Sequence, residues 1–120
     1  MNPQELKRNL AQFTGTESYH SWSVIFPHYV LSDGAKYLAE EAGAYWLMDM
    51  IGSHLPMHTD TFGVAKLVVT NDRAVFTLDD GNGNVICRQE IPFTDFPLPE
   101  IRLYVQRQDR LWVLFLPSEY

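Results

Sequence analysis

The residues with the clearest capacity for chemistry lie on one apolar helical stretch, residues 32–54. Glu41 and Asp49 share roughly one side of it with Tyr37 and Tyr45, because their spacings are near multiples of four. A carboxylate on a mostly apolar helix is costly to bury unless it has a partner. General acid–base catalysis at a raised pKa is one interpretation. A structural hydrogen bond to a tyrosine, an arginine or a helix end is the commoner one.

The histidines suggest a metal site. His54 and His58 are four residues apart, the spacing that places two ligands on one face of a helix, and Asp60 follows closely. Pro56 lies between the two histidines, so they do not share one helix. We therefore expect a polar helix exit, where His54 suits the negative end of the helix dipole. We expect no metal and no cofactor.

Nucleophile motifs are absent from the sequence. Gly52-Ser53-His54 lacks the glycine spacing of a nucleophile elbow. Cys87, the single cysteine, falls in a predicted half-buried strand, where it packs as a small apolar residue. Residues 79–84 (DDGNGN) predict a hairpin turn and lack the length and closing glutamate of an EF-hand loop. We identify no catalytic residue, and the sequence favours a protein that is not an enzyme.

Aromatic residues gather where the sequence predicts loops or short strands. Exposed loop aromatics mark binding patches. A small domain also uses them to seal the ends of its core, and this second interpretation is favoured. The residues concerned are Tyr19, Trp22, Phe26, Tyr29, Phe93 and Phe96.

Two predicted helices position these groups. The first begins at Asn2-Pro3 and runs to about residue 13, with Gly15 as a left-handed cap. The second spans residues 33–54, and Ser32 and Asp33 are both good N-caps for it; it is apolar almost all the way round and so should be buried on more than one side. Between them, Pro27 forbids a central strand and favours short extended pieces on either side.

After Pro56 the pattern changes to short strands separated by turns. Residues 92–99 carry three prolines and predict a crossing loop or an edge, and LWVLFL (111–116) is apolar on both faces. The predicted fold is α+β: two helices (about 3–13 and 33–54), then an antiparallel meander of about five strands packed on the long helix. The predicted strands are 64–70, 74–78, 85–91, 101–105 and 111–116.

Composition narrows the classes of function. The 120 residues suit one domain, 1–120, with a single core. A net charge of −6 argues against direct binding of duplex nucleic acid. The N-terminal residues lack the apolar region of a secretion signal, and no apolar run is long enough to cross a bilayer. We expect a cytoplasmic protein.

Four segments resemble a family of small bacterial proteins of unknown function, which occur in bacterial genomes and on mobile elements such as plasmids and phage. The resemblance spans nearly the whole chain; it implies a single cytoplasmic domain and no catalytic residue. The segments are FTGTESY (13–19), SDGAKYLAEEAGAYWL (32–47), IPFTDFPL (91–98) and LPSEY (116–120). Their polar and aromatic members include Thr14, Thr16, Glu17, Tyr19, Asp33, Tyr37, Glu41 and Tyr45.

Three hypotheses for function follow. The first is a small acidic protein-binding module, an inhibitor or accessory protein of a mobile element, whose partner could be basic. The second is a small ligand-binding domain or enzyme with a pocket between the long helix and the sheet. The third is a homodimer in which a second copy covers one face of LWVLFL. The candidate binding residues are Glu17, Tyr19, His20, Trp22, Tyr37, Glu41 and Tyr45.

Overall fold

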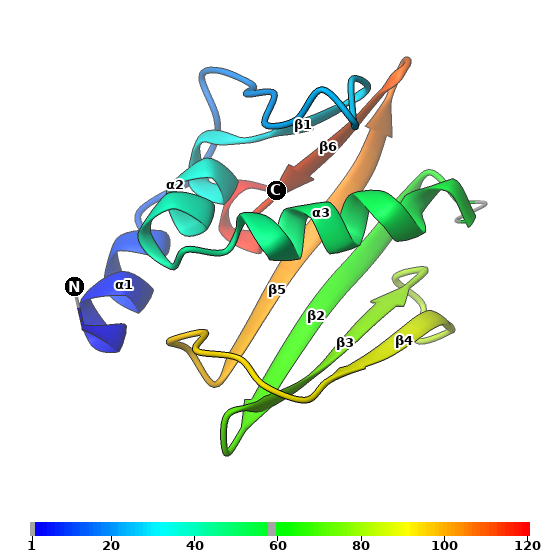
Figure 1. Ribbon diagram of the computed structural model, residues 1–120. Coiled ribbons are helices and arrows are strands. Elements are labelled where there is room, and N and C mark those ends of the chain that lie inside the picture. Colours follow the sequence, from blue (N-terminus) through cyan, green and yellow to red (C-terminus); the bar gives the residue numbers. More distant parts are fainter. Residues whose placement is uncertain (1, 58–59) are drawn as a thin grey trace.

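The computed structural model describes residues 2–57 and 60–120. Within them, three α-helices and a six-stranded mixed sheet form an α+β fold (Figure 1). The predicted fold class is confirmed, and the predicted numbers of helices and strands are only roughly right. The helices are α1 (Pro3–Leu10), α2 (Asp33–Glu41) and α3 (Tyr45–His54), and the strands are β1 (Tyr29–Leu31), β2 (Phe62–Thr70), β3 (Arg73–Asp79), β4 (Val85–Ile91), β5 (Glu100–Gln108) and β6 (Leu111–Phe115).

The sheet has the strand order β1-β6-β5-β2-β3-β4, and β1 runs parallel to β6 while the other neighbours are antiparallel. The expectation of a purely antiparallel sheet is therefore wrong at β1. With three residues, this strand is too short to show an alternating pattern. The extended pieces expected around Pro27 are present, because an isolated bridge joins His20 to Leu31.

The predicted long helix is two helices. Gly43 adopts a φ of +59°, which ends α2, and the Ala44 N–H bonds to the Ala39 carbonyl at 2.8 Å. The alanines on both sides of Gly43 continue the apolar pattern, so periodicity alone does not reveal the break. Of the two N-cap candidates, Ser32 is the cap, since its hydroxyl accepts the Ala35 N–H at 3.1 Å, and Asp33 is the first residue of α2.

The first helix begins as predicted and ends early. Asn2 caps it by accepting the Glu5 N–H at 2.8 Å. α1 stops at Leu10, about one turn before the predicted end. Gly15 lies beyond the helix and outside the left-handed region, so the expectation that it caps this helix is wrong.

The core lies between the sheet and the helices α2 and α3, which cover one face (Figure 1). Leu38, Met48, Ile51 and Leu67 are completely buried there. Each such side chain contributes about 1.5–3 kcal/mol of transfer free energy relative to exposure. The space between the helices and the sheet is therefore filled with apolar side chains.

The opposite face of the sheet carries a smaller apolar cluster beside β6. Val113 and Phe115 are buried there, although the helices lie on the other side. The Phe115 ring packs against the rings of Tyr104 and Tyr120, with centroids 5.8 and 5.9 Å away. Both faces of LWVLFL are therefore covered, and the chain itself supplies both covers.

The segment between β4 and β5 is the predicted crossing loop. It returns the chain from the sheet edge to the middle, passing β3 and β2 (Figure 1). Backbone hydrogen bonds fix it at both ends, from the Thr94 N–H to the Asp72 carbonyl and from the Val69 N–H to the Pro99 carbonyl, each 2.8 Å long. Phe96 of this segment is buried.

In the described residues, no helix combines the length and apolar character that a membrane crossing requires.

Candidate functional site

A polar cluster surrounds the N-terminus of α2. Ser32 is fully buried, and its hydroxyl donates to the Glu119 carboxylate. The same carboxylate accepts the Gly34 N–H at 3.0 Å and the Leu116 N–H at 2.9 Å. A negative group is favoured at this position because the helix dipole is positive there. The anion site of this helix is thus occupied by the protein's own C-terminal segment.

Gly34 allows the C-terminal segment to approach so closely. A Cβ atom at this position would lie 2.6 Å from Glu119 Oε1 and 2.6 Å from Leu116 Cδ1. Any larger residue would displace one of these groups. The spacing of SDG and LPSEY in sequence gives no hint of this contact.

Asp33 fastens the preceding loop to α2. Its carboxylate accepts the Glu17 N–H at 2.9 Å and lies 2.7 Å from His20 Nε2, and its own N–H donates to Thr16 Oγ1 at 2.8 Å. The His20 hydrogen bond, followed by that of the Glu17 N–H, lowers the pKa of the Asp33 carboxyl below its ordinary value. A histidine–carboxylate pair can orient a general base. Here these hydrogen bonds go to residues 16–20, and the arrangement is a structural clasp.

The loop 21–28 is supported by a stack of aromatic rings beside α3. The Phe26 ring lies 5.9 Å from the Trp22 ring and 5.5 Å from the Tyr29 ring, centroid to centroid. The Trp22 indole N–H donates to Asp49 of α3 at 2.9 Å. Asp49 therefore forms a structural hydrogen bond, although its partner is a tryptophan and the carboxylate is exposed.

Two apolar side chains project from this loop into solvent. Val24 is 95% exposed and Ile25 is 76% exposed. The backbone beneath them is ordered by hydrogen bonds from the Phe26 N–H to the Ser23 carbonyl and from the Ile25 N–H to the Ser23 hydroxyl, each 3.2 Å long. Neither Val24 nor Ile25 is among the binding residues predicted from the sequence. The apolar doublet immediately before Phe26-Pro27 was the available signal.

The structure divides the predicted site residues among separate places. Glu17, Tyr19 and His20 lie near the start of α2, and Trp22 supports the loop 21–28. The other three sit elsewhere on α2 and α3.

Those three helix residues have different surroundings. The Tyr37 hydroxyl accepts a hydrogen bond from Asn9 at 2.9 Å. Glu41 is exposed at the end of α2. Tyr45 begins α3, where burial, and secondarily the charge of Glu40, raises the pKa of its phenol. The seven residues thus do not line one pocket.

A cleft of about 340 Å³ lies on the sheet face away from α2 and α3. Tyr19 is the only predicted site residue among those that line it in the described chain. Amide, hydroxyl and aromatic groups border the cleft together, which suits a small polar ligand or a peptide side chain. The lining residues are Thr16, Tyr19, Gln106, Gln108, Val113, Phe115, Glu119 and Tyr120.

The metal hypothesis involves a residue outside the described part of the chain, His58. His54 is described, and its Nε2 lies 3.1 Å from Gln89 Oε1 while its ring stacks on Phe76 at 5.8 Å. Among residues 2–57 and 60–120, no three histidine, cysteine or acidic side chains are grouped as metal ligands. Burial raises the pKa of the Cys87 thiol, which fits an unreactive packing role.

Comparison with known proteins agrees with the fold. Residues 4–120 match the model of a family of unknown function, DUF6876. No curated protein matches the sequence. A crystal structure of a protein of unknown function from Enterococcus faecalis is similar, with a TM-score of 0.59 over 77% of this chain and 89% of that chain, at 16% sequence identity. At this identity the likeness concerns the fold alone.

Proposed function

This chain belongs to DUF6876, a family of unknown function, and we propose that it is a non-enzymatic protein-binding module that docks through the loop 21–28. The observation that carries the proposal is the near-complete exposure of Val24 and Ile25. Large apolar side chains grouped at the surface mark sites of protein association. The partner would offer an apolar pocket for these two side chains.

The loop is ordered before any partner arrives. The stack of Trp22, Phe26 and Tyr29 and the bond from Trp22 to Asp49 support it from below. Ordering an interface costs conformational entropy on binding, and a preformed loop avoids part of that cost. This supports a role for Val24 and Ile25 as anchors of a specific contact.

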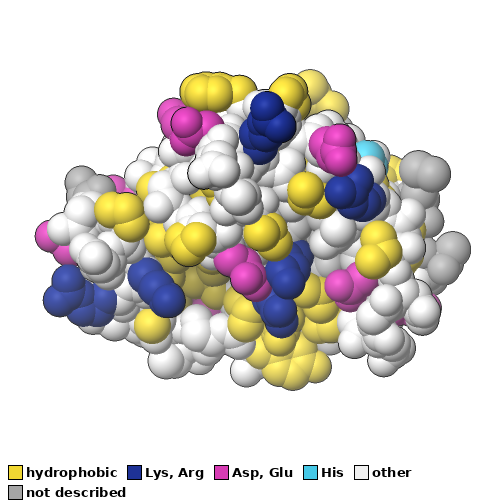
Figure 2. Space-filling model, turned by 90° about the horizontal axis from the view of Figure 1, so that it is seen from below, with side chains coloured by type: hydrophobic (Ala, Val, Ile, Leu, Met, Phe, Trp, Pro, Cys, Tyr) yellow, Lys and Arg dark blue, Asp and Glu magenta, His cyan; other side chains and the backbone are white. Residues whose placement is uncertain are grey.

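Charge favours a protein partner over a membrane or duplex nucleic acid. The chain carries a net charge of −6, which opposes contact with anionic lipid and with phosphate. Figure 2 shows acidic and basic side chains intermixed with hydrophobic ones on the face that it displays. Because the net charge is negative, the proposal includes a basic partner. Because of the family resemblance, it also includes a cytoplasmic role as an inhibitor or accessory protein of a mobile element.

The cleft bordered by Tyr19, Gln106 and Tyr120 supports a second candidate, a small-ligand-binding domain. Its combination of amide and aromatic groups is the observation in its favour. The sequence predicted such a pocket between the long helix and the sheet. That space holds Leu38, Met48 and other buried side chains.

Capture from a bacterial lysate with four immobilised proteins tests the proposal. These are the wild type, the loop variant Val24→Ser/Ile25→Ser, the cleft variant Tyr19→Ser and the control Val68→Ser, which removes an exposed valine on the face away from the helices. We expect a stoichiometric partner to be lost only with the loop variant, at an unchanged melting temperature. A partner lost with Tyr19→Ser and retained by the loop variant would assign binding to the cleft instead. Absence of any stoichiometric partner would refute the proposal.

A further inference from the structure

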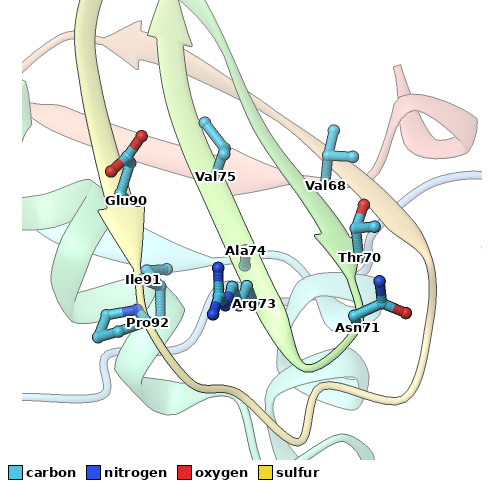
Figure 3. Close-up of a pocket in the computed structure, with 9 residues that line it drawn as sticks. All are labelled: Val68, Thr70, Asn71, Arg73, Ala74, Val75, Glu90, Ile91 and Pro92. Carbon is cyan, nitrogen blue, oxygen red and sulfur yellow. The ribbon is translucent and has the colours of Figure 1, made fainter.

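The strand β4 is an open edge of the sheet. It pairs with β3 on one side and is last in the strand order, and Figure 3 shows it as the outermost strand. An unpaired strand edge presents N–H and C=O groups ready to bond another strand. At the other end of the sheet, β1 is flanked by the chain's own bridge between His20 and Leu31. Within residues 2–57 and 60–120, the open edge is therefore at β4.

The side chains of β4 form a self-complementary series. Arg88 and Glu90 lie opposite Thr77 and Val75 of β3, on the sheet face away from the helices, and Gln89 separates them. The side chains of Arg88 and Glu90 are 56% and 74% exposed. Figure 3 shows Glu90 beside Val75 on this face.

Exposed apolar side chains lie at both ends of the same edge. Val85 and Ile86 at its start are 58% and 39% exposed, and Phe93, just after its end, is 72% exposed. The charged side chains of Arg88 and Glu90 interrupt an edge that is otherwise suited to pairing. Charged edge residues commonly prevent such pairing between molecules. On β4, however, the positions of Arg88 and Glu90 allow the edge to pair with a second copy of itself.

We propose that two copies of this chain pair antiparallel through β4, around a two-fold axis at Gln89. In this register Arg88 of each copy faces Glu90 of the other, so two ion pairs form across the interface. The apolar start of each strand, Val85 and Ile86, lies along the end of the other, toward Phe93. The charged residues at the centre of the edge thus face residues of opposite charge, and the apolar residues at its start face apolar residues after its end.

The neighbouring symmetric registers are disfavoured. In an antiparallel pair, directly opposed residues point to the same face of the sheet. A two-fold axis between two β4 strands must therefore pass through a pair of identical residues, and the neighbouring registers move this axis by one residue. An axis at Arg88 places two arginines opposite each other, and an axis at Glu90 places two glutamates opposite each other; like charges in such pairs are destabilising. The charges therefore select the axis at Gln89.

This pairing differs from a dimer through LWVLFL. Both faces of β6 are covered within the chain, by the helices and by the cluster of Tyr104 and Tyr120. Pairing at β4 instead joins two six-stranded sheets edge to edge. Both sets of helices then lie on the same side of the continuous sheet, because a two-fold axis perpendicular to the sheet preserves its faces.

Charge exchange tests the register by sedimentation equilibrium. The wild type should show a monomer–dimer equilibrium. Arg88→Glu alone and Glu90→Arg alone should each weaken dimerisation by at least about tenfold, because each places like charges opposite each other. An equimolar mixture of the two variants should recover the wild-type dissociation constant, since every opposed pair is then of opposite sign. The melting temperature of each single variant, measured in dilute solution, should stay unchanged.

Two results would overturn the proposal: a wild type that is monomeric at its highest soluble concentration, or single variants that dimerise as tightly as the wild type. A disulfide supplies an independent check of the axis. In a Cys87→Ser background, Gln89→Cys should crosslink two copies when copper phenanthroline oxidises the thiols, because opposed Cα atoms lie within disulfide range. Thr77→Cys in the same background, one strand inward, should not. Equal crosslinking at both positions would contradict the register.

Discussion

The two ends of the sheet differ in how their edge strands are finished. At the β1 end, the loop 14–20 and the C-terminal segment meet at the N-terminus of α2, and Glu119 satisfies three donors. At the β4 end, Arg88 and Glu90 form an exposed ion pair, and the strand edge is open. One end is closed by the chain itself and the other is available to a partner. Substitutions at the closed end should therefore affect folding, and those at the open end association.

The largest expected effect is at a buried position of the closed end. Leu114 of β6 is completely buried, whereas Ile86 of β4 is 39% exposed. Leu114→Ala should lower the free energy of unfolding by about 2–5 kcal/mol, through lost burial and the cavity left behind. Ile86→Ala, measured in dilute solution, should lower it by less than about 1 kcal/mol. If urea unfolding showed that Leu114→Ala and Ile86→Ala lower the free energy of unfolding equally, the two ends of the sheet would not differ in this way.

Two glutamates provide the next comparison. Glu119→Ala leaves the buried Ser32 hydroxyl and the Gly34 N–H without their acceptor, so the free energy of unfolding should fall by about 1–3 kcal/mol. Glu90→Ala removes an exposed ion pair, and the change should stay within about 0.5 kcal/mol. Glu119→Gln, which keeps the size and one acceptor oxygen, should restore part of the loss. Thermal and urea unfolding of the three variants would show whether Glu119 closes this end.

The smallest expected effect is the acid dependence of the clasp at Asp33. The pKa of its carboxyl lies below the ordinary value of 3.8, first because of the His20 hydrogen bond and then because of the Glu17 N–H. A lowered pKa in the folded state means that the stabilisation is complete above the ordinary pKa, which the unfolded chain has, and is lost as pH falls through the folded-state pKa. In Asp33→Asn, the deficit in unfolding free energy should therefore shrink on acidification below about pH 4. A deficit that is constant with pH would exclude the carboxylate as its source.

The strands that alternate and end in turn residues could be predicted from the sequence. Asn71 and Asp72 adopt the positive φ values, 51° and 64°, that a tight hairpin needs. By contrast, Gly43 lies between alanines that preserve the apolar pattern, and β1 has too few residues to show a period. Local patterns predict local structure. A break that keeps the pattern, or a strand defined by a distant partner, stays hidden.

The candidate site was predictable to a smaller extent. Glu17, Tyr19 and His20 do lie together, and family resemblance drew attention to the first two of them. Glu119 joins them only because β6 returns the chain beside β1, more than 80 residues after Ser32. Exposure of Val24 and Ile25 depends on Phe26 turning inward onto its neighbouring rings. These are tertiary facts that no spacing in the sequence records.

The bond between Ser32 and Glu119 also bears on synthesis of the protein. It joins residues 87 positions apart, and the strand that pairs with β1 is β6, which is made after the other five strands. On the ribosome, the first third of the chain must therefore wait for its final partner while β2, β3 and β4 can already form hairpins with their sequence neighbours. The end of the sheet that is most firmly closed in the mature protein is thus the last one that a nascent chain can complete.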